Sequence, residues 1–327
     1  MTTAPAQLGA VLAAGGPQLA AALERTEARL AEVVAGHGAE LEAHSAGMLA
    51  AGGKRLRPML VFLAAADDSD QRLVSAGVAV ELLHMATLVH DDVLDRAPVR
   101  RGRPTVFAAA GRLAATASGD LLFSRAFAEL AGTGSGEAVS RLSEASSALA
   151  RGELMQRADA WIADVPAERY LERCRLKTAS LFDACCRLGA LFGGTPERSE
   201  ALGAFGEGIG LAFQLLDDVL DVSGPAERTG KPRGTDLLDG TVTLPLILAR
   251  RRDGELRDID LRAAVTDAAQ AEEVCDRIAA TGALDEARSL ALEHVRAAKA
   301  RLDRLGLPDD REQALRLVAD GVVDRYA

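Results

Sequence analysis

The sequence predicts an all-α protein. Residues that favour helices, Ala, Leu, Arg and Glu, dominate the chain, and its apolar residues recur with helical spacing. Alternating β-branched runs, which are typical of strands, are absent. The breaks between the expected helices contain Gly and Pro and lie at 52–53, 98–104, 132–136, 193–196 and 223–225. None of them is long enough to link two separate domains. We therefore expect a single all-α domain over residues 1–327.

Each expected helix lies between two such breaks or turns. In chain order, the expected helices are Gln18–Ala35, Gly38–Ala51, Leu56–Ala66, Arg72–Arg96, Thr105–Leu130, Gly136–Asp159, Ala167–Phe192, Glu197–Val222, Leu238–Arg252, Ala268–Ala280, Leu284–Leu305 and Asp310–Tyr326.

Composition excludes several classes of protein. The chain has 327 residues and a formal net charge of −10, which opposes binding to nucleic acid and to anionic membrane surfaces. Its four cysteines have neither metal-ligand spacing nor the density of a disulfide scaffold, so we expect buried thiols. We find no signal peptide and no run of about 20 uncharged apolar residues. These observations predict a soluble, cytoplasmic protein without a transmembrane segment.

One acidic pentapeptide, Asp-Asp-Val-Leu-Asp, occurs at 91–95 and again at 217–221. Each copy closes a largely apolar stretch, and on a helix its first and last Asp lie one turn apart on one face. Their mutual repulsion, and the helix dipole at a C-terminus, require a positive partner. Mg²⁺ takes carboxylate oxygens and bridges to phosphates. Because the flanking sequences differ, we interpret the copies as two sites for a metal-bound diphosphate rather than as solvated helix ends or a duplicated domain.

Basic groups accompany the acidic clusters. Residues 53–58 read Gly-Lys-Arg-Leu-Arg-Pro at an expected helix start, where the dipole favours an anion. Residues 100–105 read Arg-Arg-Gly-Arg-Pro-Thr shortly after the first cluster, and Lys177-Thr178 and Lys231 complete the set. Arg and Lys both bind phosphate. The pattern therefore predicts a site for two diphosphates.

Together these motifs resemble those of the trans-prenyl diphosphate synthases, or polyprenyl synthetases. The resemblance covers roughly residues 52–245. Its motifs are 53–58, 84–95, 100–102, Gly119-Asp120, 177–179 and 213–218. It implies an all-α bundle around a deep central cavity, commonly a homodimer. It also implies that the protein condenses isopentenyl diphosphate with an allylic diphosphate and uses Mg²⁺ as cofactor.

The resemblance also implies roles for individual residues. The Mg²⁺ ligands would be Asp91, Asp92, Asp95, Asp217, Asp218 and Asp221, which with Lys177 form the expected catalytic set. The allylic diphosphate would contact Arg100, Lys177, Thr178, Gln214 and Lys231. The isopentenyl diphosphate site would contain Lys54, Arg57, His84 and Arg101, and Arg55 belongs to the same motif. His84 lies two turns before Asp91 on the same helical stripe.

One position departs from the family pattern, which usually reads Asp-Leu-x-x-Gly-Lys-x-Thr-Leu-Pro after the second cluster. Here Thr241 stands where the Lys is expected, which removes a positive charge. This leaves open a low-activity or regulatory subunit of a prenyl synthase. A terpene cyclase is a weaker alternative, because only 3% of the chain is aromatic and such enzymes stabilise cations on aromatic faces.

Product length depends on the residues below the first cluster. Ala86 and Thr87 precede Asp91 by about one turn, and both are small. In the family, bulky residues here close the cavity and small residues let the product pass. The sequence therefore favours a medium- or long-chain polyprenyl diphosphate, with geranylgeranyl diphosphate as the alternative.

Overall fold

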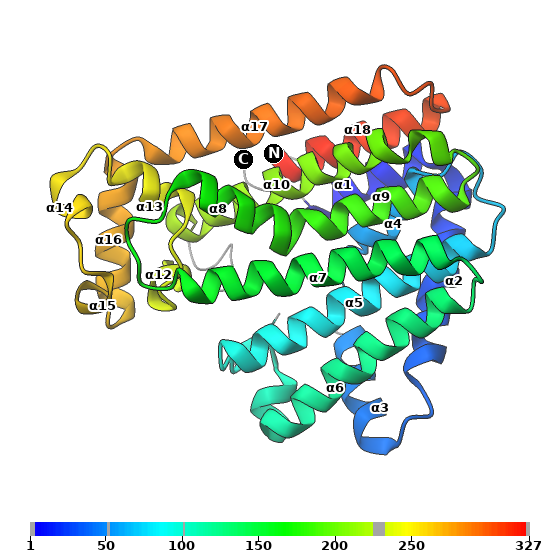
Figure 1. Cartoon of the computed structure of the whole chain (residues 1–327), viewed down its shortest axis with the longest axis horizontal. Helices are drawn as coiled ribbons and strands as arrows, with labels where there is room; N and C mark the ends of the chain where they lie inside the picture. Colours follow the sequence, from blue (N-terminus) through cyan, green and yellow to red (C-terminus); the bar gives the residue numbers. More distant parts are fainter. Residues whose placement is uncertain (1–3, 51–52, 101, 225–232, 325–327) are drawn as a thin grey trace.

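The computed structural model describes residues 4–50, 53–100, 102–224 and 233–324, and these are almost entirely helical (Figure 1). The longer helices are α1 (Ala4–Ala14), α2 (Gly16–Val34), α3 (Ala39–Ala50), α4 (Leu56–Leu63), α5 (Arg72–Leu94), α6 (Val106–Ala131), α7 (Gly136–Ala158), α8 (Ala167–Cys174), α9 (Ser180–Phe192), α10 (Ser199–Ser223), α16 (Ala268–Ala280), α17 (Ala283–Leu302) and α18 (Asp309–Asp324). The all-α prediction is confirmed.

Short elements connect these helices. They are a hairpin of β1 (Val99–Arg100) and β2 (Arg103–Pro104), a π-helix (Arg175–Ala179), a 3₁₀ turn (Pro196–Arg198), and α12 (Thr235–Leu238), α13 (Leu244–Ala249), α14 (Gly254–Arg257) and α15 (Leu261–Ala264). The hairpin is antiparallel, with Val99 opposite Pro104.

The helices differ from the prediction most clearly in three places. Helix α1 was not expected, and it is separated from α2 by Gly16, whose φ of 74° lies in the left-handed region. The expected helix Leu238–Arg252 is interrupted by Gly240, with φ of 72°. The expected helix Ala167–Phe192 contains the π-helix. The glycines at 16 and 240 permit the positive φ that ends a helix, a role that the prediction did not assign to them.

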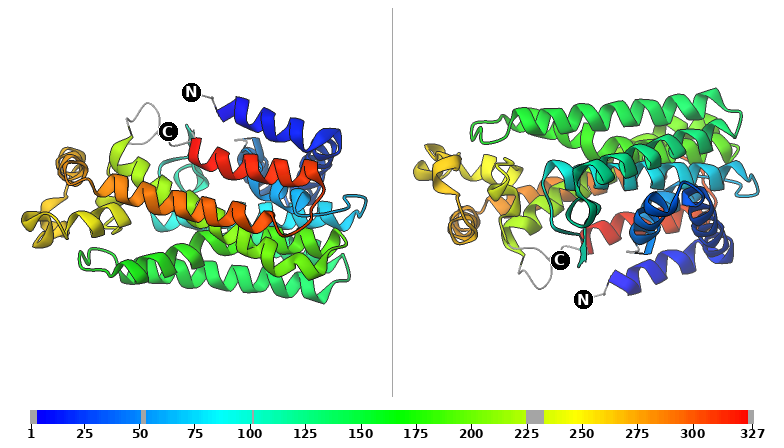
Figure 2. Two further views of the ribbon diagram at one scale, coloured as in Figure 1. Left: turned by 90° about the horizontal axis from the view of Figure 1, so that it is seen from above. Right: turned by 90° about the horizontal axis from the view of Figure 1, so that it is seen from below.

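The direction of three long helices positions the site. Helices α5, α7 and α10 run the same way and end at the same end of the molecule, whereas α6 and α9 run back (Figure 1). Helices α12 to α16 gather at that end, and α17 and α18 cover the side of α10 (Figures 1 and 2). The C-terminal ends of α5 and α10, where both acidic pentapeptides lie, are therefore at one end of the bundle.

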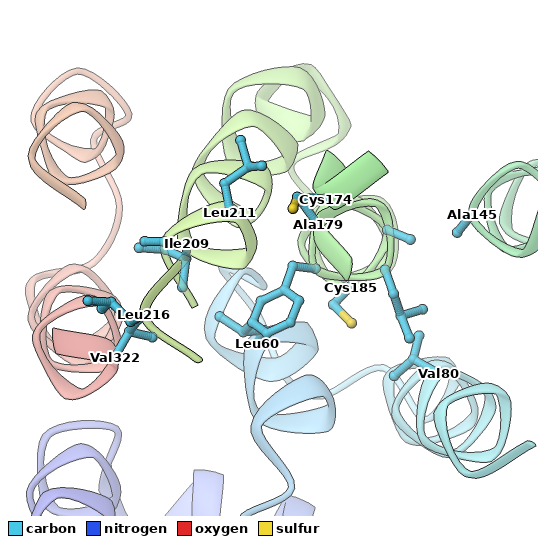
Figure 3. Packing of buried hydrophobic residues seen from close by; sticks show 14 of the residues in the cluster. Leu60, Val80, Ala145, Cys174, Ala179, Cys185, Ile209, Leu211, Leu216 and Val322 are labelled. Atoms are coloured by element: carbon cyan, nitrogen blue, oxygen red, sulfur yellow. The ribbon is translucent and has the colours of Figure 1, made fainter. Parts of the chain in front are cut away.

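The buried apolar side chains form one cluster that runs from Val11 to Val322. Figure 3 shows Leu60 of α4, Val80 of α5 and Cys185 of α9 within it. Close helix contacts need small residues: a Cβ on Gly189 would lie 2.2 Å from the carbonyl oxygen of Val61. The four cysteines are buried free thiols, as expected. A single core supports the expectation of one domain, which stays a prediction.

Two helices are long and apolar enough, by length and composition, to cross a membrane. In α5, 72% of the apolar window is buried inside the protein, as in the core helix of a globular domain. In α6 only 22% is buried, and Leu113 is 85% exposed. The expected absence of a transmembrane segment therefore stays a prediction, and most of the apolar window of α6 is not buried inside the protein.

Candidate active site

Both acidic pentapeptides end a helix, as predicted. Asp91 and Asp92 lie in the last turn of α5, and Asp95 is its C-cap. The second copy occupies the last two turns of α10. Asp92 and Asp218 are buried, with exposed fractions of 6% and 3%. The helix dipole disfavours anions at these ends, so the neighbours of each carboxylate decide whether it can be ionised.

Arginines pair with the first cluster. Arg100, in the β1 strand, donates from Nε to Oδ1 of Asp92 over 2.7 Å. Arg157, at the end of α7, donates from Nη2 to Oδ1 of Asp95 over 2.5 Å. The chain reverses directly after α5, where the N–H of Ala97 donates to the carbonyl of Asp92 over 3.0 Å. This reversal and the short hairpin bring Arg100 back onto its carboxylate.

Lys177 connects α7 with the first cluster. Its Nζ lies 2.5 Å from Oε2 of Glu153 and donates to Oε1 of Gln156 over 3.2 Å. Burial raises the pKa of Asp91 to about 6, although Lys177 opposes this. Burial also lowers the pKa of Lys177, but the charges of Asp91 and Glu153 outweigh it and the net pKa is raised. Lys177 is therefore a charged ammonium beside the first cluster.

Two neutral side chains hold Asp218 of the second cluster. Tyr170 donates from its hydroxyl to Oδ2 of Asp218 over 2.5 Å, and Gln214 donates from Nε2 to Oδ1 over 2.7 Å. Burial raises the pKa of Asp218, and the charge of Asp236 raises it further, against these two hydrogen bonds. Oδ2 of Asp221 accepts the backbone N–H of Asp236 over 3.3 Å. Asp218 therefore has neutral donors where Asp92 has an arginine.

Two consecutive residues of the π-helix join the clusters. Lys177 faces the end of α5, and Thr178 donates from Oγ1 to Oε1 of Gln214 over 2.7 Å. Gln214 in turn binds Asp218. Helix α7 can approach the π-helix because Gly152 has no side chain: a Cβ there would lie 2.5 Å from the backbone nitrogen of Lys177. Single π-turns inside helices occur frequently at functional sites.

The carboxylates fit a divalent metal that is shared with a diphosphate. Among the residues that the structure describes, no three His, Cys, Asp or Glu side chains are arranged to hold an ion by themselves. Mg²⁺ commonly binds through one or two carboxylates, with waters and substrate phosphates completing its shell. Raised pKa values at Asp91 and Asp218 mean that ionised carboxylates are costly there until a cation arrives. The donor set is therefore suited to Mg²⁺.

The residues expected to bind isopentenyl diphosphate lie around α4 and α5. Lys54 is exposed just before α4, and the guanidinium of Arg57 lies 5.0 Å from the ring centre of Phe182. His84 is half-buried in α5, two turns before Asp91. Arg101 and Lys231 are outside the described residues.

Arg55 has a structural position instead. Its φ of 47° is left-handed, and its Nη1 donates to Oε1 of Glu81 over 2.8 Å. It also pairs with Glu27 of α2. Arg55 thus joins α2 to α5 at the start of α4, and this arrangement orients the motif that carries Lys54 and Arg57.

The two residues proposed to control product length differ in burial. Thr87 is half-buried on the stripe of α5 that contains His84 and Asp91, and its Oγ1 donates to the carbonyl of His84 over 2.8 Å. Ala86 has no exposed surface. Of these two, Thr87 is therefore better placed to contact a growing chain.

The expected deep central cavity also stays a prediction. Two hollows, of about 600 and 300 Å³, lie outside the acidic clusters. They are lined by Trp161 and Arg262 in one case, and by Val165 and Arg250 in the other.

Sequence reasoning missed several neighbours of the clusters. They are Gly152, Glu153, Arg157, Tyr170 and Asp236. A Gly inside a helix pattern, followed by an acid and a base four residues apart, was a detectable signal for the first three. Tyr170 had no comparable signal, because its partner Asp218 is 48 residues away.

The fold and the site define a class of protein: an all-α bundle with two acidic helix ends and basic residues between them. The Polyprenyl synthetase family profile matches residues 39–281. This chain belongs to the polyprenyl synthetase family, and the prenyltransferase class expected from the sequence is confirmed.

Relatives and solved structures agree with this assignment. The chain is 41% identical to heptaprenyl diphosphate synthase component 2 of Geobacillus stearothermophilus over 277 residues, which are 82% of this chain and 84% of the relative. It is 37% identical to geranylgeranyl diphosphate synthase of Methanosarcina mazei, over 88% and 90% of the two chains. A polyprenyl synthase from Caulobacter crescentus, solved with calcium and isoprenyl diphosphate, superposes with a TM-score of 0.88 at 35% identity, covering 95% of this chain and 98% of that one.

Proposed function

We propose that this protein condenses isopentenyl diphosphate with an allylic prenyl diphosphate in a Mg²⁺-dependent reaction. The observation that carries the proposal is the Lys177-Thr178 pair, which connects two acidic helix ends with a half-buried ammonium and a hydrogen-bonded hydroxyl. A diphosphate needs this combination of cation sites and donors. The calcium and isoprenyl diphosphate named for the Caulobacter crescentus structure support the same combination of ligands.

The residues have separate tasks in this reaction. Mg²⁺ held by the six aspartates would neutralise charge on the departing diphosphate. Arg100 and Lys177 bind the same diphosphate and stabilise its developing charge as the allylic carbon–oxygen bond breaks. The double bond of isopentenyl diphosphate, held by Lys54, Arg57 and His84, attacks the resulting allylic cation. Loss of a proton then yields a product five carbons longer, and no side-chain nucleophile is needed.

The direct test is incubation of the purified chain with labelled isopentenyl diphosphate and several allylic primers, followed by sizing of the products. We expect diphosphate release and chain elongation with Mg²⁺, and neither after chelation. Elongation that persists at full rate after chelation would contradict the role of the metal. Absence of any elongation with every primer would contradict the proposed enzyme and favour the subunit alternative below.

We propose a medium- or long-chain product, with geranylgeranyl diphosphate as the alternative. The small side chain of Thr87 supports a longer product, and the names of the relatives include both classes. Thr87→Phe should shorten the longest product without abolishing the first condensation, because the diphosphate contacts are untouched. Ala86→Phe, at a fully buried position, tests overpacking. An unchanged distribution from both folded, active variants would place control of chain length elsewhere, most plausibly in α6, where Phe123 and Phe127 pack against each other at 5.2 Å.

We also propose a homodimer formed through the outer face of α6. The support is its exposed apolar surface, which includes Leu113 at 85% exposure. Light scattering should give about twice the monomer mass, and Leu113→Glu should lower it. A monomer at micromolar concentration would contradict the proposal.

The alternative is a subunit that needs a second protein. It draws support from Thr241 and from the words "component 2" in the name of the Geobacillus stearothermophilus relative. Full elongation by the purified chain alone would contradict this alternative. The cytoplasmic location stays a prediction.

A further inference from the structure

The only tryptophan of the chain has an unusual backbone conformation. Trp161 lies in the α7–α8 loop, residues 159–166, and its φ of 68° is in the left-handed region. Bulky residues rarely adopt this conformation, because the side chain then crowds the backbone. Such outliers persist only where the surrounding structure holds them, and they are common at functional sites. The contacts of Trp161 therefore identify what this conformation serves.

Trp161 holds the loop of residues 239–243, which joins α12 to α13. Its backbone N–H donates to the carbonyl of Gly240 over 2.7 Å. Its indole packs so closely on Gly240 that a Cβ there would lie 2.3 Å from the ring atom Cε2. Gly240 also has a φ of 72°. Both the left-handed turn and the ring therefore require glycine at this position, and the two loops are fitted to each other.

The 239–243 loop connects Trp161 with the second acidic cluster. The N–H of Thr241, the residue after Gly240, donates to the carbonyl of Asp236 over 2.7 Å. The N–H of Asp236 in turn donates to Oδ2 of Asp221 over 3.3 Å. Asp236 is thus bound to the loop through its carbonyl and to the carboxylate through its N–H. A continuous set of contacts joins the indole to the last carboxylate of the cluster.

We propose that Trp161 is a positioning residue for the second acidic cluster. By holding the 239–243 loop, it fixes the N–H of Asp236 and so orients the carboxylate of Asp221 before Mg²⁺ and diphosphate bind. Because coupling between two sites acts in both directions, binding at the cluster also changes the fit of the indole on Gly240. This inference rests on the proposed function and adds to the site a residue outside its acidic and basic motifs.

The first test removes the ring and keeps the loop. Trp161→Gly retains the backbone N–H and suits the left-handed conformation, so it should fold, and Trp161→Phe keeps a ring over Gly240. In metal-free protein, amide hydrogen exchange at residues 236–241 should be faster in Trp161→Gly than in wild type. Calorimetry with Mg²⁺ and inorganic diphosphate should give a Mg²⁺ half-saturation about tenfold higher, which corresponds to loss of one hydrogen bond to a charged group. Trp161→Phe should recover most of both changes.

The fluorescence of Trp161 provides a second measurement. Because the chain contains one tryptophan, its emission reports this loop alone. Mg²⁺ with inorganic diphosphate should shift the emission with the same half-saturation that calorimetry gives. Gly240→Ala should raise the Mg²⁺ half-saturation in wild type, and it should have a smaller effect in Trp161→Gly, because the ring that the methyl group would strike is gone. Full additivity of the two changes would overturn the proposal, as would binding without any shift in emission.

The matched control is Arg262→Met. The guanidinium of Arg262 lies 5.5 Å from the ring centre of Trp161, in the hollow that the indole lines, and Arg262 is exposed. Solvent weakens such a contact, so this change should leave the Mg²⁺ half-saturation at the wild-type value. An increase equal to that of Trp161→Gly would show general weakening of the loop and overturn the proposal.

Two further outcomes separate this inference from the proposed function. Wild-type hydrogen exchange at residues 236–241, or a wild-type Mg²⁺ half-saturation, in folded Trp161→Gly rejects only this inference if the wild-type protein elongates prenyl chains. A wild-type protein that does not elongate them rejects the proposed function.

Discussion

The two acidic clusters share one pentapeptide but have different neighbours. At the end of α5, Arg100 and Arg157 form ion pairs with Asp92 and Asp95. At the end of α10, Tyr170 and Gln214 donate neutral hydrogen bonds to Asp218. Asp92 and Asp95 therefore have cationic partners, whereas Asp218 has two neutral ones. Identical pentapeptides therefore have carboxylates with different electrostatic surroundings, because the side chains packed against them differ.

The largest effect should come from removing either cluster. Asp91→Asn and Asp217→Asn should each lower kcat by about a thousandfold or more, because each removes a charge that the transition state requires. Helical content, measured by circular dichroism, should stay unchanged. Near-normal turnover of either folded variant in Mg²⁺ would contradict the claim that both clusters are needed, since one cluster would then suffice.

The pH dependence of stability should report the buried acid of the first cluster. The pKa of Asp91 is raised to about 6 in the folded protein from 3.8, so the metal-free folded state binds the proton more tightly than the unfolded state. The free energy of unfolding should therefore fall as pH rises from about 4 to 6, by at most about 3 kcal/mol.

Comparison with Asp91→Asn, in metal-free protein, isolates this contribution. The stabilisation by Mg²⁺ with diphosphate should grow over the same pH range, because metal and proton compete. An identical pH profile in the variant would show that Asp91 is not the group responsible.

Tyr170→Phe tests the hydrogen bond that Tyr170 donates to Asp218. Loss of a buried hydrogen bond to a carboxylate should lower the free energy of unfolding by about 1 to 3 kcal/mol. It should also raise the pKa of Asp218 and increase the Mg²⁺ concentration that activity requires.

The matched change at the first cluster is Arg100→Met, which should raise mainly the KM for the allylic substrate. If the two variants altered the same kinetic constant to the same degree, the distinction between the clusters would be lost.

Arg157→Met should have the smallest effect. Its side chain and that of Asp95 are 38% and 35% exposed, so solvent screens their ion pair. We expect a change in the free energy of unfolding below about 1 kcal/mol and a kcat within about threefold of wild type. If the variant kept its stability in chemical denaturation but lost most of its activity, Arg157 would be part of the substrate site.

Local pattern predicted most of the helices and much of the candidate site. The spacing of apolar residues located the long helices, and the acidic runs that close two of them placed both clusters at helix ends. Local pattern did not predict the π-helix at Lys177, whose hydrogen bonds depend on how the neighbouring helices pack. The hairpin that returns Arg100 to Asp92 was missed because its strands have two residues each.

The sequence by itself determined the helices, the two carboxylate runs and the basic residues that accompany them, because propensity, periodicity and charge are local properties. Only the tertiary structure decided which neighbour each carboxylate has. Tyr170 meets Asp218 across 48 residues, and Arg173 meets Val242 across 69. Such contacts depend on how α8, α10 and the 239–243 loop pack, and this packing made identical pentapeptides different.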